Sequence, residues 1–232
     1  MSKKIFLYVL GGVFLLFILY FFWLVAQYYG QIQRGELVDL GQGSFSQGAA
    51  KAPGQKTNVV DLSQIKGVHS PEVGNPNAKL QIVEFIDFTC PFSKQAFLVM
   101  RELVTRYPER MNLIIRHFPL QDAAHQGGLE AAIAAVCASQ QGKFWAYHDK
   151  LFQNQKNFTK ADLLSYSGQV GLDVPSFTKC LDSDDARKKV ENDWSDGYSL
   201  GVQGTPTFFV ANQKIEGSAP LNAWEKVIIK QK

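Results

Sequence analysis

The stretch of sequence that decides the fold is LQIVEFIDFTCPFS, residues 80–93. Its apolar part, Leu80–Phe88, predicts a buried strand, and Cys90–Tyr107 predicts the helix that follows. A cysteine at such a junction lies beside the first-turn N–H groups and the positive end of the helix dipole, which favour an anion. Thiols in that position are more acidic than a free cysteine, so Cys90 is a candidate thiolate nucleophile.

Ser93 changes the chemistry that this motif permits. Many redox sites have the pattern Cys-x-x-Cys, in which the second thiol resolves the mixed disulfide that the first one forms. This chain has Ser93 at the second position. A hydroxyl cannot release a disulfide-bound partner, but it can donate a hydrogen bond to the Cys90 thiolate. The motif therefore predicts attack without self-resolution. A further alternative is that Ser93 is an engineered replacement of cysteine, made to trap the mixed disulfide.

The composition of the chain is that of a globular protein. Of 232 residues, 46% are hydrophobic and 19% charged, enough for one medium domain with appendages. The net charge of +3 is small, and no basic stripe is interleaved with exposed aromatics, so we expect no nucleic-acid partner. The histidines lack paired ligand spacing, so we expect no metal site and no cofactor. They are His69, His117, His125 and His148.

The N-terminal segment predicts a membrane anchor. Ile5–Ala26 carries no charge and as a helix would be about 33 Å long, against a hydrocarbon core of about 30 Å. Lys3 and Lys4 precede it, so the positive-inside rule keeps the N-terminus in the cytoplasm. We therefore expect a cytoplasmic tail at 1–4 and a single transmembrane helix at 5–29.

A cleaved signal peptide is the alternative to the anchor, because it also begins with lysines. The apolar segment is longer than the usual 7–15 residues or so of a signal peptide, and Leu24-Val25-Ala26 is a poor cleavage site. Residues 30–76, rich in Gly, Gln, Ser, Ala and Pro, are predicted to be a flexible linker, with the folded domain at 77–232. The expected location is the bacterial cytoplasmic (inner) membrane, with the folded domain on the extracytoplasmic side.

The three cysteines divide into two kinds. Disulfides persist outside the cytoplasm. Cys137 and Cys180 both fall in a helical region, whereas Cys90 stands alone in its motif. The simplest assignment is one structural disulfide between Cys137 and Cys180 and one free, reactive thiol. Such a bridge stabilises a fold by about 4 kcal/mol on the chain-entropy model. Two inert buried thiols are the alternative.

The rest of the pattern predicts a mixed sheet with helices on both faces. Met111–Phe118 is expected to be a strand parallel to Leu80–Phe88, and about 123–200 is expected to be helical throughout. Two short strands and a helix then close the chain. The expected elements are Gly128–Gln140, Lys143–Gln153, Thr159–Val170, Pro175–Leu181, Asp184–Leu200, Thr207–Ala211, Lys214–Glu216 and Pro220–Lys230.

Four motifs occur in order along the chain: VEFIDFTCPF at 83–92, RHFPL at 116–120, GKFW at 142–145 with His148, and GTPT at 204–207. Together they resemble the DsbA-like branch of the thioredoxin superfamily, over roughly residues 70–230. The resemblance implies an α/β thioredoxin-like fold with an inserted helical subdomain at about 121–200, preceded here by the single transmembrane helix. It also implies thiol–disulfide exchange.

The resemblance further implies a substrate-binding surface around Pro206. The equivalent proline is cis in this superfamily and lies against the active-site cysteine. Because proline has no N–H, strand pairing ends there and leaves the Thr205 backbone free to pair with an extended substrate. Phe92, beside the cysteine, adds an apolar rim. On the residues alone, Pro206 is also consistent with an ordinary turn before a strand, and Phe92 with the core of the helix.

Glu84 interrupts an otherwise apolar strand and matches a buried acid of this superfamily. A carboxyl buried there has a raised pKa and can move protons for the thiol. The alternative is an acid at the edge of the strand that reaches solvent or pairs with a lysine. Asp87 lies nearer the cysteine and is expected to serve the turn or an exposed rim.

Two functions from different classes fit these residues. The first is disulfide formation or isomerisation on cysteine-containing secreted or envelope proteins, with Cys90 as nucleophile, Ser93 stabilising it and Glu84 relaying protons. Release then depends on the client's own second thiol, a small thiol or a membrane redox partner, so the motif argues against direct dithiol oxidation. The second is a redox-inactive module that binds extended polypeptides. A glutathione-transferase-like activity is a third, weaker alternative.

Overall fold

The computed structural model describes residues 16, 18–21, 23, 65–67, 69–210 and 213–230. The chain divides into two compact units, Met1–Lys56 and Thr57–Lys232. In the first unit the described residues are helical, and the rings of Tyr20 and Trp23 stack with their centroids 5.9 Å apart. Most of the predicted anchor and linker lies outside the described residues. Among those that are described, no helix has the length and apolar character needed to cross a bilayer.

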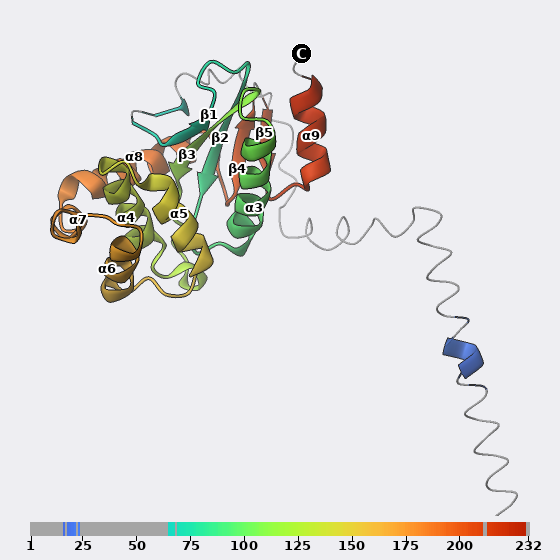
Figure 1. The fold of residues 1–232 in the computed structure, drawn as a ribbon, viewed down its shortest axis with the longest axis horizontal. Helices are drawn as coiled ribbons and strands as arrows, with labels where there is room; N and C mark the ends of the chain where they lie inside the picture. The colour runs from blue at the N-terminus through green and yellow to red at the C-terminus, as the bar shows by residue number, and fades with distance from the viewer. Residues whose placement is uncertain are drawn as a thin grey trace, which may run out of the picture. The chain divides into compact units, whose positions relative to one another are not determined.

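The second unit is built on a mixed sheet whose described strands have the order β1-β3-β2-β4-β5 (Figure 1). As the sequence predicts, β2 pairs with β3 in parallel; the other neighbouring pairs are antiparallel. β2 therefore lies in the middle of the sheet, where both its edges are paired. The strands are β1 (Glu72–Gly74), β2 (Leu80–Ile86), β3 (Met111–His117), β4 (Thr207–Val210) and β5 (Gln213–Glu216).

β1 corrects the expected start of the fold. It lies within 30–76, the range predicted to be linker, and pairs with β3 so that Glu72 is opposite Ile114. The N–H of Asn75 also donates to the carbonyl of Met111, at 3.0 Å. Ile65, still earlier in the chain, is only 1% exposed. The sequence gives no signal for β1 because the strand is very short and its side chains are partly exposed.

The predicted helices are present, with small differences at their ends. α6 begins after Thr159, which forms a capping box with Asp162, and α3 begins after Cys90. β2 ends at Ile86, earlier than predicted, because the chain turns at Asp87. The helices are α3 (Pro91–Arg106), a 3-10 turn (Ala123–His125), α4 (Gly128–Gln140), α5 (Phe144–Gln153), α6 (Lys160–Gln169), α7 (Val174–Leu181), α8 (Asp184–Ser199) and α9 (Leu221–Lys230).

The two faces of the sheet are covered by different cores. Ile82 and Ile86 point into the larger core, which includes residues of α3, α4, α5 and α9. Val83 and Phe85 point to the opposite face and pack in a smaller core with Phe118. In Figure 1, α3 and α9 lie along the sheet, while α4 to α8 gather at its side. Successive side chains of β2 therefore pack into the two cores in turn, so the strand is buried on both faces of the sheet.

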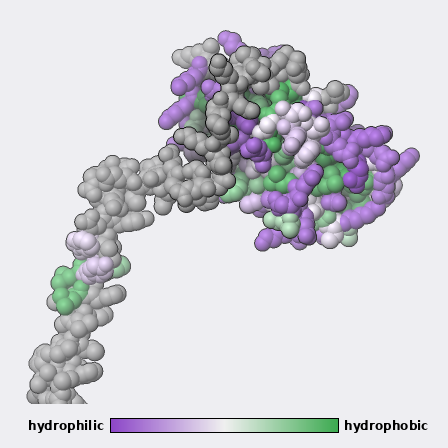
Figure 2. Space-filling view, turned by 180° about the vertical axis from the view of Figure 1, so that it is seen from behind, coloured by the Kyte–Doolittle hydropathy of each residue, from purple (hydrophilic) through white to green (hydrophobic). Residues whose placement is uncertain are grey.

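In the sequence, the helices α4 to α8 come after β3 and before β4. They form the inserted helical subdomain that the resemblance implies. Within it, a disulfide joins Cys137 of α4 to Cys180 of α7, with their Cα atoms 5.7 Å apart. Cys90 is free. On the face of the molecule shown in Figure 2, hydrophilic residues surround smaller hydrophobic patches.

Candidate active site

Cys90 lies at the start of α3 and contacts a loop far away in the chain. It is the N-cap residue of α3 and is 3% exposed. Its thiol donates a hydrogen bond to the carbonyl of Thr205, with the sulfur and the oxygen 3.1 Å apart. The Thr205–Pro206 peptide bond is cis. The structure thus brings together the predicted nucleophile and both residues of the predicted substrate-binding loop.

Ser93 is buried on the first turn of α3, but its hydroxyl does not take the predicted partner. Its oxygen accepts a hydrogen bond from the N–H of Asp87, at 3.4 Å. Among the described residues it forms no hydrogen bond with Cys90. The Ser93 hydroxyl therefore connects α3 to the preceding turn, and the Cys90 thiol forms its hydrogen bond with Thr205 instead.

Asp87 organises the turn that carries Cys90 and is buried rather than at an exposed rim. One carboxylate oxygen accepts hydrogen bonds from the N–H and the hydroxyl of Thr89, at 2.7 and 2.6 Å. The other accepts from the N–H of Leu120, at 2.9 Å. The backbone carbonyl of Asp87 accepts from the N–H of Cys90. Asp87 thereby fixes the cysteine turn against the segment that follows β3.

Gln155 is a site residue that the sequence does not reveal. Its side-chain amide donates to the carbonyls of Phe88 and Cys90, each at 2.9 Å. The residue follows α5 in the inserted subdomain, so these two bonds connect the insertion to the cysteine turn. A lone glutamine in a loop carries no sequence signal for such a contact.

Glu84 lies in the middle of β2 and is 2% exposed. Its neighbours across the sheet are Ile115 on β3 and Phe208 on β4. No donor among the described residues forms a hydrogen bond with its carboxyl. Burial raises the pKa of Glu84 to about 8, because the ionised form loses its hydration. The carboxyl can therefore exchange a proton close to neutral pH.

The predicted substrate-binding residues surround the thiol. Phe92 is 39% exposed on the first turn of α3. Among the described residues the buried hydroxyl oxygen of Thr205 has no hydrogen-bond partner, and Pro206 accepts a hydrogen bond from the N–H of Gly217 through its carbonyl. The exposed ring therefore follows Cys90 closely in the chain, and the Thr205 carbonyl contacts its thiol.

Two histidines are buried behind the cysteine turn, as core histidines. The ring of Phe88 lies 6.0 Å from that of His117 and 5.6 Å from that of His148, measured between centroids. Burial lowers the pKa of His117 to about 3 and also lowers that of His148. Across the described residues, no three His, Cys, Asp or Glu side chains are grouped to hold a metal ion.

A cysteine at the start of the helix that follows the central strand of a mixed sheet, held against a cis-proline loop, is the arrangement of thioredoxin-like redox proteins of the DsbA type. The chain belongs to the thioredoxin family, because the family model described as "Thioredoxin" matches residues 66–230. The match includes β1, which lies in the range predicted to be linker.

Solved structures share this fold. The thiol-disulfide exchange protein alpha-DsbA2 from Wolbachia pipientis superposes with a TM-score of 0.67, at 22% identity, over 74% of this chain and 91% of the other. A thioredoxin-like oxidoreductase from Silicibacter pomeroyi superposes with a TM-score of 0.65, at 26% identity, over 72% and 95%. The fold of this chain is therefore one that thiol–disulfide oxidoreductases use.

Curated relatives carry a different name. The chain is 33% identical over 175 residues to the Na(+)/H(+) antiporter NhaA of Herminiimonas arsenicoxydans. The match covers 73% of this chain but spans only 27% of that relative's length.

Proposed function

We propose that this protein catalyses thiol–disulfide exchange on client polypeptides through Cys90. The contact between the Cys90 thiol and the Thr205 carbonyl carries the proposal. Polypeptides that pair with the backbone of Thr205 bring their own sulfur atoms beside the nucleophile. The antiporter activity named for the relatives belongs to proteins of which this chain spans about a quarter, so we do not extend it to this chain.

The first step is attack by the Cys90 thiolate on one sulfur of a client disulfide. A bond forms between Cys90 and that sulfur, the client's S–S bond breaks, and the client's other sulfur leaves as a thiolate. The proton lost by Cys90 passes to Glu84 in those molecules whose buried carboxyl is ionised, a fraction that grows as the pH approaches its pKa of about 8. Nothing is oxidised or reduced overall in this step, because one disulfide replaces another.

The second step needs a thiol from outside the site, because Ser93 cannot supply one. Attack by another thiolate of the same client forms a new client disulfide and returns the Cys90 thiolate, which is isomerisation. Attack by a small thiol or by a membrane redox partner also releases the client. The monothiol site therefore favours rearrangement of disulfides over oxidation of dithiols.

The proposed setting is the outer side of a bacterial cytoplasmic membrane. The uncharged segment 5–26 and the lysines before it support a single-pass anchor with its N-terminus inside. The Cys137–Cys180 disulfide supports an oxidising compartment. The proposed clients are cysteine-containing secreted or envelope proteins.

Reactivation of a protein with scrambled disulfides tests this function. The full chain is expected to restore the activity of such a protein in the presence of a small thiol, and Cys90→Ala is expected to restore none. Equal reactivation by both would reject the exchange function.

A binding module for extended polypeptides is the second candidate, and the serine at residue 93, where a resolving cysteine would be needed, favours it. On this account Cys90→Ala binds unfolded polypeptides as well as the native chain does. Substitution of Thr205 and Pro206 then abolishes binding.

A further inference from the structure

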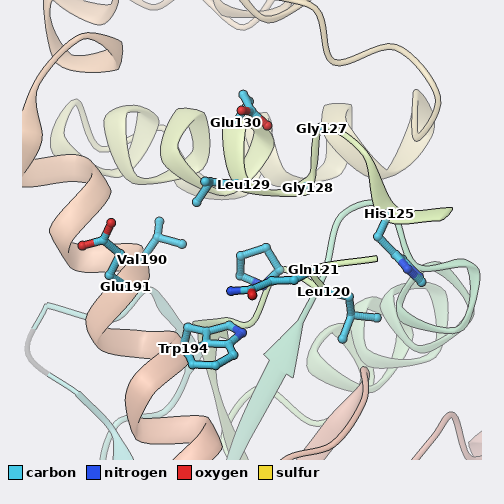
Figure 3. A pocket seen from close by; sticks show the side chains of 11 residues that line it. Leu120, Gln121, His125, Gly127, Gly128, Leu129, Glu130, Val190, Glu191 and Trp194 are labelled. Carbon is cyan, nitrogen blue, oxygen red and sulfur yellow. The ribbon is translucent and has the colours of Figure 1, made fainter. Parts of the chain in front are cut away.

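A pocket of about 360 Å³ opens beside the cysteine turn. It lies between the N-terminus of α4, the middle of α8 and the segment that follows β3 (Figure 3). Five of its lining side chains are apolar: Pro119, Leu120, Leu129, Val190 and Trp194. Three separate parts of the chain therefore build one hollow with a largely apolar floor.

Two hydrogen bonds and one close approach place this pocket near Cys90. Leu120, which lines it, donates its N–H to the Asp87 carboxylate, and Asp87 accepts the N–H of Cys90. Gly128, which also lines it, packs so close to Asp87 that a Cβ there would lie 2.8 Å from a carboxylate oxygen. Asp87 thus contacts both the nucleophile and two residues that line the pocket, so a polypeptide attached to Cys90 can reach the pocket within a few residues.

Trp194 forms a fixed wall of the pocket. Its ring stacks on Phe118 and on Tyr198, with centroids 5.5 and 5.2 Å apart and planes inclined by 10° in both pairs. Figure 3 shows the indole and Leu120 at the same end of the pocket. An apolar stem that enters there meets a surface that is already positioned.

The rim of the pocket is acidic. Glu130 of α4 and Glu191 of α8 line it, are exposed and form no ion pair with any described residue. Of the lining residues, His125 alone can carry a positive charge, and its ring nitrogen is 2.7 Å from the carboxylate of Asp122. Arg187, one turn before Glu191 on α8, forms no ion pair among the described residues either. The pocket therefore combines an apolar floor with unpaired negative charge at its mouth.

We propose that this pocket is a specificity subsite for a lysine or arginine side chain of a client polypeptide held at Cys90. The inference rests on the proposed exchange function. The methylene stem packs on Leu120, Val190 and Trp194, and the cationic head lies near Glu130 and Glu191. Clients with a basic residue a few positions from the reacting cysteine are therefore preferred.

Rates of mixed-disulfide formation test the subsite. Short peptides carry one cysteine activated with thionitrobenzoate, and a Lys, Arg, norleucine or Glu residue at one position that is varied along the peptide. Release of thionitrobenzoate by the full chain follows the reaction with Cys90. Lys and Arg peptides are expected to react about three to five times faster than norleucine peptides at one favoured spacing. The preference is expected to shrink between about 0.01 M and 1 M salt, because screening shortens the reach of the charges.

Charge-neutral variants separate the rim from the rest of the surface. In Glu130→Gln combined with Glu191→Gln, the preference for Lys and Arg is expected to disappear while the rate with norleucine stays the same. The matched control is Glu102→Gln combined with Glu216→Gln, which removes the same charge from exposed ion pairs with Arg106 and Lys214. This control is expected to keep the preference.

Three results would overturn the subsite: equal rates for Lys and norleucine, a preference that survives in the pocket variant, or a preference lost equally in the control. Binding of the same peptides to Cys90→Ala, followed by fluorescence anisotropy, tests the pocket without the reaction. If no peptide reacts with the native chain but the Lys preference in binding remains, the exchange function fails and the basic subsite stands. If no peptide reacts and the binding shows no preference for Lys, the subsite is rejected as well.

Discussion

The thiol of Cys90 donates a hydrogen bond to the carbonyl of Thr205, although 115 residues separate them in the chain. The contact joins the first turn of α3 to the loop that precedes β4. It places the nucleophile beside the backbone on which an extended client is proposed to pair. The proposed attack and the proposed docking therefore share one place in the fold.

Replacement of the buried hydroxyl by a thiol tests the proposed lack of self-resolution. In Ser93→Cys, a second sulfur lies one helical turn after Cys90, so the mixed disulfide with a client peptide is expected to be at least about tenfold shorter-lived. Thiol titration and quenched gel assays measure this lifetime. Ser93→Ala is the control and is expected to keep the long lifetime. Its free energy of unfolding is expected to fall by about 1 kcal/mol, because the Asp87 N–H loses its acceptor. An unchanged lifetime in Ser93→Cys would reject the role given to residue 93.

Gln155 is expected to position the cysteine turn from the inserted subdomain. Gln155→Ala removes hydrogen bonds to the carbonyls of Phe88 and Cys90, so the free energy of unfolding is expected to fall by about 1–3 kcal/mol. The rate of alkylation of Cys90 is also expected to change, because the turn loses its support. Urea unfolding and iodoacetamide kinetics measure the two effects. Gln153→Ala, an exposed position at the end of α5, is the matched control and is expected to leave both unchanged.

Glu84 is expected to make the stability of the fold depend on pH. The pKa of Glu84 is about 8 in the folded chain, against an ordinary value of 4.5 that applies to the unfolded chain. At a pH between these two values, the folded state holds a proton that the unfolded state has released. The free energy of unfolding therefore falls as pH rises from about 4.5 to 8, by at most about 1.4 kcal/mol per pH unit. Glu84→Gln stays neutral and is expected to flatten this slope in urea unfolding between pH 5 and 8. Parallel pH profiles for the two proteins would contradict the buried, protonated state.

The disulfide of the inserted subdomain is expected to stabilise the fold without taking part in exchange. Replacement of Cys137 and Cys180 by alanine is expected to lower the free energy of unfolding by about 2–4 kcal/mol, since the bridge spans a sequence separation of 43. Mixed-disulfide formation at Cys90 is expected to continue at the native rate. A longer-lived mixed disulfide in this variant would show instead that one of these cysteines resolves it.

The elements that the sequence predicts best are those with strong local signals. β2 and β3 are long apolar runs, Pro91 follows the cysteine at the start of α3, and Thr159 caps α6. β1 lacks any such signal, because it is short and depends on pairing with β3. Local sequence signals therefore predict the strands from β2 onward, but they do not predict the edge strand β1.

The residues of the site also divide into those that the sequence predicts and those that it does not. The burial of Glu84 follows from its place in a central strand, and the approach of Thr205 to Cys90 follows from the motifs shared with the DsbA-like branch. The partner of Ser93 and the two bonds of Gln155 depend on how the Asp87 turn and the inserted helices meet, which no local pattern encodes. The sequence thus predicts the reacting groups better than the residues that position them.

The measurement that tests the central claim most directly is a mass-spectrometric map of the disulfides formed when the full chain meets an excess of a client disulfide peptide. The account predicts a peptide adduct on Cys90, an intact bridge between Cys137 and Cys180, and no adduct on Cys90→Ala. An unmodified Cys90, or an adduct that persists in Cys90→Ala, would contradict it.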